Sequence, residues 1–245
     1  MEPADLSYTV RRAKGTAAFS IVRENQKPLM ASDDSELLFF FEKDLTIELQ
    51  RLRCDLYFVH SAVLELAGKA LMLVGESGSG KSTTVWALLH HGFRYLSDEL
   101  APVDLETLKV CPYPHALCLK NEPPTSYPLP KKTLYTSQTL HVPTENLPAG
   151  TTTVPIPLAA IFFLRCHAEA SGPSVQPISR AEAGARLLAH ALNPLAHPGN
   201  GLDGAIEIVR RTAQFKLSTA DLPSTCSVVK DTLRGLSGDR CERAL

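Results

Sequence analysis

The clearest hydrophobic pattern in the chain is a short apolar run, followed by a polar loop rich in glycine and then by apolar positions at helical spacing. Residues 69–74 form the continuous apolar run typical of a buried strand. Residues 83–91, which end before Gly92, predict a helix. A second buried strand is predicted over 158–164. The pattern therefore predicts an α/β fold.

Further strands are predicted over residues 55–60, 62–66, 93–99 and 215–217, with a hairpin over 101–110. Ser179 and Glu182 have the spacing of a capping box, so a helix is expected to begin there. Another helix is predicted over 202–213. Residues 111–157 are rich in proline and predict loops and short strands, which in a compact domain are often functional.

The length of the chain, 245 residues, fits one large domain. A single domain over 1–245 is therefore expected, with a small strand and helix extension over 1–50 and a core over 51–235. Within the extension, residues 16–22 have β character, and apolar residues recur at helical spacing over 35–49.

The charge and composition of the chain limit which classes of partner and which cellular compartment are expected. The net charge is −1, and the absence of a basic cluster argues against a nucleic acid or a membrane surface as partner. The start of the chain is acidic and has no apolar segment typical of a signal peptide. The run 37–41 is too short to span a bilayer. A cytoplasmic protein is the expectation.

The six cysteines are scattered, so reduced thiols are expected. Cys111, His115 and Cys118 have the spacing C-x3-H-x2-C, which could indicate a metal site. Because zinc needs a second ligand pair and no C-x2-C or H-x3-H partner occurs, packed cysteines are the favoured interpretation.

The polar loop satisfies the pattern G-x-x-x-x-G-K-[ST], which wraps nucleotide phosphates. The residues predicted to bind the nucleotide are Gly75, Glu76, Ser77, Gly78, Ser79, Gly80, Lys81, Ser82 and Thr83. Glycines let the backbone turn its N–H groups toward an anion, and the following helix adds the positive end of its dipole. Lys81 is expected to reach the β/γ-phosphates, and Ser82 to offer a hydroxyl to Mg²⁺. The alternative, a chance turn between two core elements, is disfavoured because both flanking elements fit the motif.

Two acids, Asp98 and Glu99, end the strand predicted over 93–99, at the place where α/β sheets bind ligands. Phosphoryl transfer uses one carboxylate to hold Mg²⁺ and another to orient or deprotonate the attacking hydroxyl. Adjacent residues of a strand point in opposite directions, so the following turn must separate their roles. The alternative is a solvated acidic turn.

Three segments, 60–63, 73–82 and 92–99, together resemble the C-terminal catalytic domain of HPr kinase/phosphorylase. The resemblance is closer to the smaller HPr-kinase-related proteins found with bacterial peptide-maturation systems, including lasso-peptide kinases. That family has a histidine 15 residues before the first loop glycine, as His60 precedes Gly75, and two acids after a G-x-x-x-x-x-D pattern, as in Gly92 to Asp98.

The resemblance implies the phosphoenolpyruvate-carboxykinase-like P-loop fold, a mixed β-sheet with flanking helices. It implies that Lys81 and the loop amides bind the phosphates of ATP and that Ser82 and Glu99 hold Mg²⁺. Asp98 would take the proton of the attacking hydroxyl, and His60 would lie near the γ-phosphate and the acids. Because relatives form oligomers, a homo-oligomer is compatible with the resemblance.

Two differences from the family concern the metal and the acceptor. Glu99 stands where HPr kinase has Asp. The downstream signature that contains glycine and arginine has no counterpart, and residues 157–165 stand in its place. Lys120 is a further candidate for a phosphate contact, with a solvated surface lysine as the alternative.

The function predicted is an ATP- and Mg²⁺-dependent kinase that phosphorylates a hydroxyl, with serine favoured, on a peptide, small protein or small molecule. A non-catalytic nucleotide-binding module and a plain NTPase are the main alternatives. A decarboxylating carboxykinase on the same fold is disfavoured because its extra metal ligands are not evident.

Overall fold

The computed structural model describes residues 5–136, 138–166 and 172–236. The chain forms two compact units, residues 1–53 and residues 54–245. The boundary between the units lies close to residue 50, where the predicted extension ends, and the single domain expected over 1–245 stays a prediction. Within the described residues, no helix is both long enough and apolar enough to cross a membrane.

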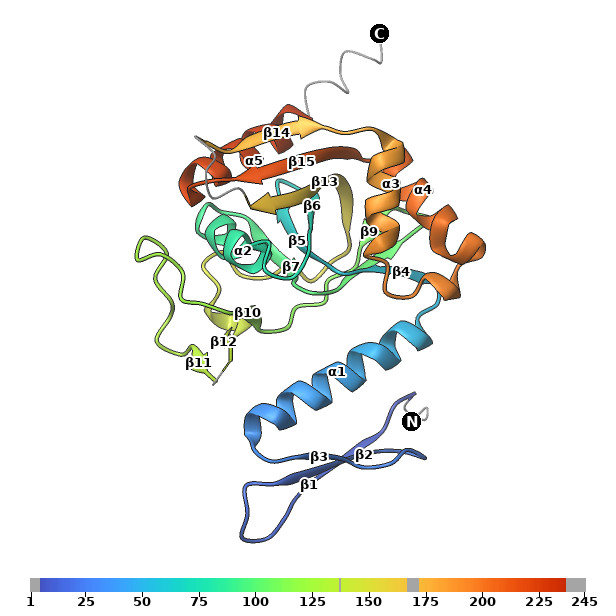
Figure 1. Cartoon of the computed structure of the whole chain (residues 1–245), viewed down its shortest axis with the longest axis vertical. Helices are drawn as coiled ribbons and strands as arrows, with labels where there is room; N and C mark the ends of the chain where they lie inside the picture. Colours follow the sequence, from blue (N-terminus) through green and yellow to red (C-terminus); the bar gives the residue numbers. More distant parts are fainter. Residues whose placement is uncertain (1–4, 137, 167–171, 237–245) are drawn as a thin grey trace. The chain divides into compact units, whose positions relative to one another are not determined.

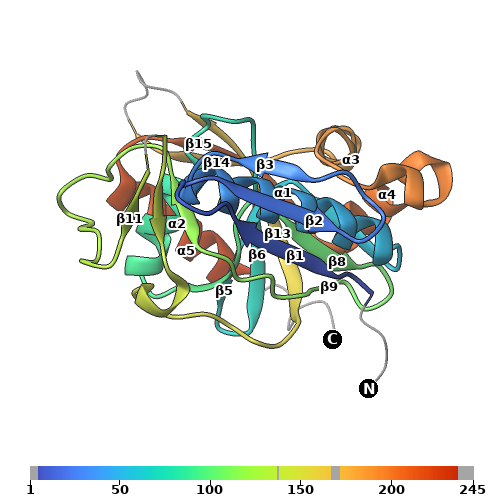
Figure 2. The same ribbon diagram turned by 90° about the horizontal axis from the view of Figure 1, so that it is seen from below.

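The first unit is a three-stranded antiparallel sheet with one long helix. Its elements are β1 (Tyr8–Arg12), β2 (Phe19–Arg23), β3 (Leu29–Ala31) and α1 (Asp34–Leu52), and the sheet order is β1-β2-β3. The strands lie along α1 (Figure 2). Arg23 of β2 pairs with Asp44 and Glu48 of α1, at 2.9 and 3.1 Å, which fixes the helix on this sheet.

The second unit is built on a mixed sheet, in the order β4-β8-β9-β13-β6-β5-β7, with β15 also pairing with β13 and β14 pairing with β15. The strands are β4 (Leu56–Val59), β5 (Ser61–Leu66), β6 (Lys69–Val74), β7 (Arg94–Ser97), β8 (Ala101–Asp104), β9 (Lys109–Val110), β13 (Ile156–Cys166), β14 (Ser174–Pro177) and β15 (Ala213–Thr219). Strand β13 runs parallel to β6 and to β15, whereas β5 runs antiparallel to both β6 and β7.

Helices cover both faces of this sheet (Figure 1). The helices are α2 (Lys81–His90), α3 (Arg180–Ala189), α4 (Leu202–Arg211) and α5 (Leu222–Gly235), with short 3-10 turns η1 (Thr144–Asn146), η2 (Pro194–Ala196) and η3 (Pro198–Gly201). A small second sheet consists of β10 (Leu117–Leu119), β11 (Leu134–Tyr135) and β12 (Leu140–Val142), in the order β10-β12-β11.

The alternation of side chains along the central strands produces two separate cores. In β6, Leu71 and Leu73 pack in the cluster that contains residues of α2 and α5, and Met72 and Val74 pack in the cluster that contains residues of α3 and α4. Because successive side chains of a strand point to opposite faces, a strand buried on both faces must be apolar throughout. This explains the continuous apolar run over 69–74.

Most of the predicted elements are confirmed, including the strand over 69–74, the hairpin formed by β8 and β9, and the helix capped by Ser179. Helix α5 was missed, although Asp221 caps it and Pro223 lies in its first turn. The fold is the predicted mixed α/β sheet with flanking helices.

Candidate functional site

The topology of the sheet brings three strand ends to one place. Ser61 of β5 pairs with Val74 of β6, so His60, one residue before, lies at the end of β6 where the phosphate loop begins. Strands β6 and β7 are both antiparallel to β5, and therefore the acids that follow β7 reach the same edge. The structure thus brings together His60, the phosphate loop, Asp98 and Glu99, all from the second unit.

The loop between β6 and α2 has the shape that a phosphate cradle needs. Gly78 and Gly80 adopt positive φ, 84° and 86°, a conformation that favours glycine. Glu76, Ser77 and Gly78 are exposed, as a loop open to a ligand requires. Among the residues that the structure describes, none hydrogen-bonds the buried hydroxyl of Ser79, so its hydrogen-bonding capacity is unused. These features fit a bound phosphate chain.

Lys81 is a buried cation at the mouth of this loop. Its side chain is only 6% exposed, and its Nζ donates hydrogen bonds to the carbonyls of Gly75 (2.6 Å) and Glu76 (3.2 Å). Burial lowers the pKa of Lys81, while the carboxylates of Glu99 and Asp98 act in the opposite direction. An anion bound in the loop would compensate this buried charge.

Asp98 is fully buried and bonds directly to the first turn of α2. Its Oδ2 accepts a hydrogen bond from Ser82 Oγ at 2.8 Å, and its Oδ1 accepts one from the N–H of Glu99. Burial, followed by the negative charge of Glu99, raises the pKa of Asp98 to about 6. Thr83 follows Ser82 in the same helical turn and is half-buried. The Asp98 carboxylate and the Ser82 hydroxyl therefore form one hydrogen-bonded pair.

Glu99 points away from Asp98 because its backbone adopts φ 71°, a strained value for a residue other than glycine. Its side chain is 54% exposed, and its Oε2 lies 3.4 Å from His60 Nδ1. The same ring nitrogen donates to the Glu99 carbonyl at 3.1 Å. The turn therefore separates the two acids: one is buried against Ser82, and the other is accessible beside His60.

Two residues that flank β10, His115 before it and Lys120 after it, also reach this edge, although only Lys120 was a site candidate. His115 hydrogen-bonds the carbonyl of Asp98, and Lys120 Nζ donates to Ser77 Oγ at 2.7 Å. Sequence reasoning considered His115 only as part of a C-x3-H-x2-C pattern. No sequence signal marks its contact, because it depends on where the proline-rich segment crosses the sheet edge.

The donor set at this edge suits Mg²⁺ bound to phosphate. Within the described residues, no three or more His, Cys, Asp and Glu side chains form a group that could hold a metal ion. Mg²⁺ bound to nucleotide needs only one or two protein ligands, because phosphates and water supply the others. The Ser82 hydroxyl and the adjacent carboxylates are oxygen ligands of the right kind.

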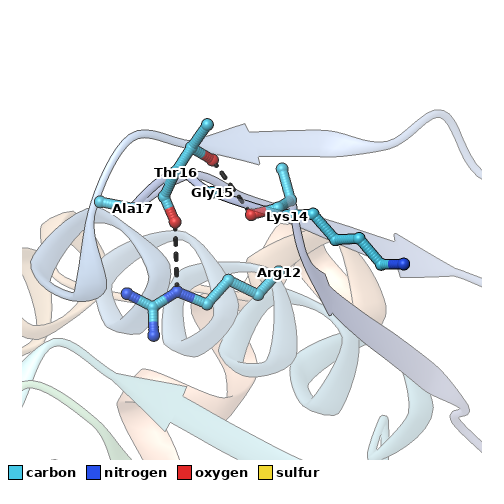
Figure 3. A pocket seen from close by; sticks show the side chains of 6 residues that line it. Arg12, Lys14, Gly15, Thr16 and Ala17 are labelled. Carbon is cyan, nitrogen blue, oxygen red and sulfur yellow. Dashed lines mark hydrogen bonds between the residues drawn. The ribbon is translucent and has the colours of Figure 1, made fainter.

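A separate hollow lies in the first unit, at the turn between β1 and β2 (Figure 3). It is lined by the consecutive residues 12–17, and the contacts within it are local: Arg12 Nε donates to Thr16 O, and Thr16 Oγ1 donates to Ala13 O. The hollow is the inside of a hairpin turn, and it does not include the loop or the acids.

We expect Gly75→Ala to distort the phosphate loop. A Cβ at this position would lie 2.7 Å from Ser79 Oγ and 3.3 Å from the Leu164 carbonyl oxygen, so the loop must shift. The expected cost is about 1–3 kcal/mol of unfolding free energy, together with weaker nucleotide binding. Gly235→Ala is the matched control, since nothing lies within 4 Å of its added Cβ. Urea unfolding and calorimetric titration with ATP measure the two effects, and equal behaviour of the two variants would contradict the prediction.

Comparison with known proteins points to one family. No family model matches the chain. Over 78 residues the chain is 33% identical to the HPr kinase/phosphorylase of Lactobacillus delbrueckii subsp. bulgaricus, a match that covers 31% of this chain and 23% of that protein. The match thus spans less than a quarter of the relative's length. Among solved structures, the HPr(Ser) kinase/phosphatase from Coxiella burnetii is 10% identical, with a TM-score of 0.38 over 74% of this chain and 98% of that chain. The chain is HPr kinase-like over the 78 matched residues, which confirms the resemblance to HPr kinase/phosphorylase inferred from its motifs. The closer resemblance to kinases of peptide-maturation systems stays a prediction.

Proposed function

We propose that this protein is an ATP- and Mg²⁺-dependent kinase that transfers the γ-phosphoryl group to a hydroxyl, with serine as the favoured acceptor. The observation that carries the proposal is the hydrogen bond between Ser82 Oγ and Asp98 Oδ2. It joins the phosphate loop to a buried carboxylate, which is the arrangement that phosphoryl transfer requires. The similarity to HPr kinase/phosphorylase supports the same reaction class.

In the proposed reaction the acceptor oxygen bonds to the γ-phosphorus while the bond to the β–γ bridging oxygen breaks. The loop amides and Lys81 hold the phosphates, and the hydroxyl proton passes to a carboxylate. Mg²⁺, held by Ser82 and a carboxylate, supplies neutralisation of the charge on the phosphate oxygens. The products are ADP, the phosphorylated acceptor and one proton, which the carboxylate releases to water after the transfer.

The two carboxylates divide the roles of proton acceptor and metal ligand. We assign the role of proton acceptor to Asp98, because its raised pKa of about 6 is suited to proton transfer near neutral pH. The role of metal ligand is then assigned to Ser82 with Glu99. One observation supports the reverse assignment: Asp98 bonds Ser82, and Glu99 is the exposed acid beside His60. Asp98→Asn and Glu99→Gln distinguish the two, as described in the Discussion.

The fold we infer is the phosphoenolpyruvate-carboxykinase-like P-loop fold. Supporting it, β5 lies between the loop strand β6 and the acid strand β7 and runs antiparallel to both, unlike the arrangement of a purely parallel sheet. We infer a cytoplasmic location, where ATP is present and scattered cysteines stay reduced. The inferred partner is the hydroxyl acceptor, and a net charge of −1 gives no reason to add a nucleic acid or a membrane.

A transfer screen with ATP labelled in the γ-phosphate tests the proposal. Peptides that contain serine are the first acceptors to try, since the motifs resemble HPr-kinase-related proteins of peptide-maturation systems, and small proteins and small hydroxyl compounds follow. Labelled product is expected with the wild type, and none with Lys81→Ala or with the matched peptides in which alanine replaces serine.

The other outcomes identify the alternatives. Release of labelled phosphate at the same rate with and without acceptor would mark an NTPase. Binding of ATP with neither transfer nor release would mark a nucleotide-binding module. Either result contradicts the kinase proposal.

A further inference from the structure

A second lysine lies over the phosphate loop, on a segment that is distant from the loop in sequence. Lys120 follows β10, whose Leu117 and Leu119 are buried in the cluster that also holds Trp86 of α2. β10 is paired with β12 through the register of Leu119 with Leu140. Because the side chains of a strand alternate, burial of Leu117 and Leu119 turns the intervening Cys118 and the following Lys120 away from this core.

The Lys120 ammonium lies on the open side of the loop. Its Nζ donates to Ser77 Oγ at 2.7 Å, and Ser77 is exposed in the middle of the loop. The same segment is held at a second point, because His115 hydrogen-bonds the carbonyl of Asp98. Residues 115–120 therefore extend from Asp98 to the phosphate loop, and they hold the Lys120 side chain against Ser77.

The Lys120 ammonium has no carboxylate partner within the part of the chain that the structure describes. None of the ion pairs there joins Lys120 to an Asp or Glu side chain. An exposed cation that lies against a phosphate loop without such a partner is available to an anionic ligand, and its hydrogen bond to a phosphate oxygen is charge-assisted.

Both lysines contact neighbouring residues of the loop. In this motif the loop lysine reaches the β/γ-phosphates. Lys81 Nζ bonds the carbonyls of Gly75 and Glu76, and Lys120 Nζ bonds the hydroxyl of the next residue, Ser77. This adjacency is the reason to assign Lys120 to the same phosphates as Lys81.

We propose that Lys120 is a second phosphate-binding residue that contacts the terminal phosphate and makes the site prefer a nucleoside triphosphate over a diphosphate. This inference rests on the proposed function, since it concerns the same nucleotide site. The Ser77 hydroxyl accepts one of the three hydrogen bonds that the Lys120 ammonium can donate. The other two N–H groups can bond phosphate oxygens, and a hydrogen bond between two charged groups is stronger than one to a neutral hydroxyl.

The test is calorimetric titration of the full chain with Mg²⁺-ATP and with Mg²⁺-ADP. Lys120→Met keeps the length of the side chain and removes the charge, and it is expected to weaken ATP binding by about tenfold, which corresponds to one charge-assisted contact. ADP binding should weaken much less, so the preference for ATP falls. Lys120→Arg, which keeps a cation, should retain most of the preference.

Lys131→Met is the matched control, because Lys131 is an exposed lysine of the same proline-rich segment. Its affinities for both nucleotides should equal those of the wild type, and thermal melts should show that each variant is folded. The inference is overturned if Lys120→Met keeps the wild-type ratio of ATP to ADP affinity. A failure of the proposed function is distinguishable, because it is measured in the labelled transfer screen and not in the titration. A wild type that binds ATP without transferring phosphate would refute the kinase and leave the effect of Lys120→Met on the affinity ratio intact.

Discussion

Replacing Lys81 with methionine should weaken ATP binding by at least about a hundredfold, since a cation that contacts two phosphates makes two charge-assisted hydrogen bonds. Methionine has a similar length but no charge and no N–H donor. The effect is expected to be large because Lys81 is buried at the mouth of the loop, where water screens the interaction poorly. Calorimetric titration with Mg²⁺-ATP measures the loss.

The same substitution should leave the protein folded. Burial lowers the pKa of Lys81, which means that the charged ammonium is held in the folded protein at a cost in free energy. Methionine removes that cost, although the carbonyls of Gly75 and Glu76 lose a donor. The unfolding midpoint is therefore expected to stay close to that of the wild type.

Lys131→Met again serves as the control for the loss of one positive charge, and it should bind ATP as the wild type does. If Lys81→Met bound ATP with wild-type affinity, residues 75–83 would not be a nucleotide loop, and the kinase proposal would be wrong. A collapse of thermal stability in Lys81→Met alone would instead show that the lysine has a structural role.

Asp98→Asn should reduce phosphoryl transfer by about a thousandfold or more while ATP binding is retained, because an amide cannot take a proton from the acceptor hydroxyl. Asparagine has the same shape: its Oδ1 can accept from the Glu99 N–H, and its Nδ2 can donate to Ser82 Oγ in place of the bond that Ser82 donates to Asp98. Single-turnover transfer to the best acceptor from the labelled screen measures the first effect, and calorimetry measures the second.

The dependence on Mg²⁺ decides between the two role assignments. If Asp98 takes the proton, Asp98→Asn loses transfer at every Mg²⁺ concentration, and Glu99→Gln needs more Mg²⁺. Under the reverse assignment, excess Mg²⁺ restores transfer in Asp98→Asn, and Glu99→Gln is the variant that stays inactive. Full transfer activity in Asp98→Asn at ordinary Mg²⁺ would exclude both roles for this carboxylate.

Asp98→Asn should also change the pH dependence of stability. Burial and the charge of Glu99 raise the pKa of Asp98 from 3.8 to about 6 in the folded protein. The unfolded chain therefore releases this proton at lower pH than the folded protein does. Between pH 3.8 and about 6 the folded protein binds more protons than the unfolded chain, so the free energy of unfolding of the wild type falls as the pH rises through this interval. Asparagine does not titrate, so the stability of the variant relative to the wild type should increase over the same interval in urea unfolding experiments.

Local sequence was sufficient to predict the parts of the site that lie on one continuous segment. The apolar run over 69–74, the glycines and the helix after Lys81 belong to one strand, loop and helix, whose geometry depends on neighbouring residues. The strand end that carries Asp98 and Glu99 was recognised in the same way. The position of His60 at this edge was implied only by the family resemblance.

Other features could not be predicted because they depend on pairing between distant segments. The order of the sheet places β5 between β6 and β7, and only this order brings His60, the loop and the acids together. The contacts of His115 with Asp98 and of Lys120 with Ser77 join residues that lie 17 and 43 positions apart. Helix α5 is a different case, because its local signals, the Asp221 cap and Pro223 in its first turn, were present in the sequence and were overlooked.

The sequence alone was therefore sufficient to predict the phosphate loop. Its glycines, its lysine and the start of its helix lie on one continuous segment, and their conformations need no distant partner. The separation of the acids is a property of the tertiary structure. Asp98 is buried against Ser82, and Glu99 is exposed beside His60, because a strained turn and an antiparallel neighbour strand direct them apart. Burial and charge proximity, which set the pKa of Asp98 and the environment of Lys81, exist only once the chain has folded.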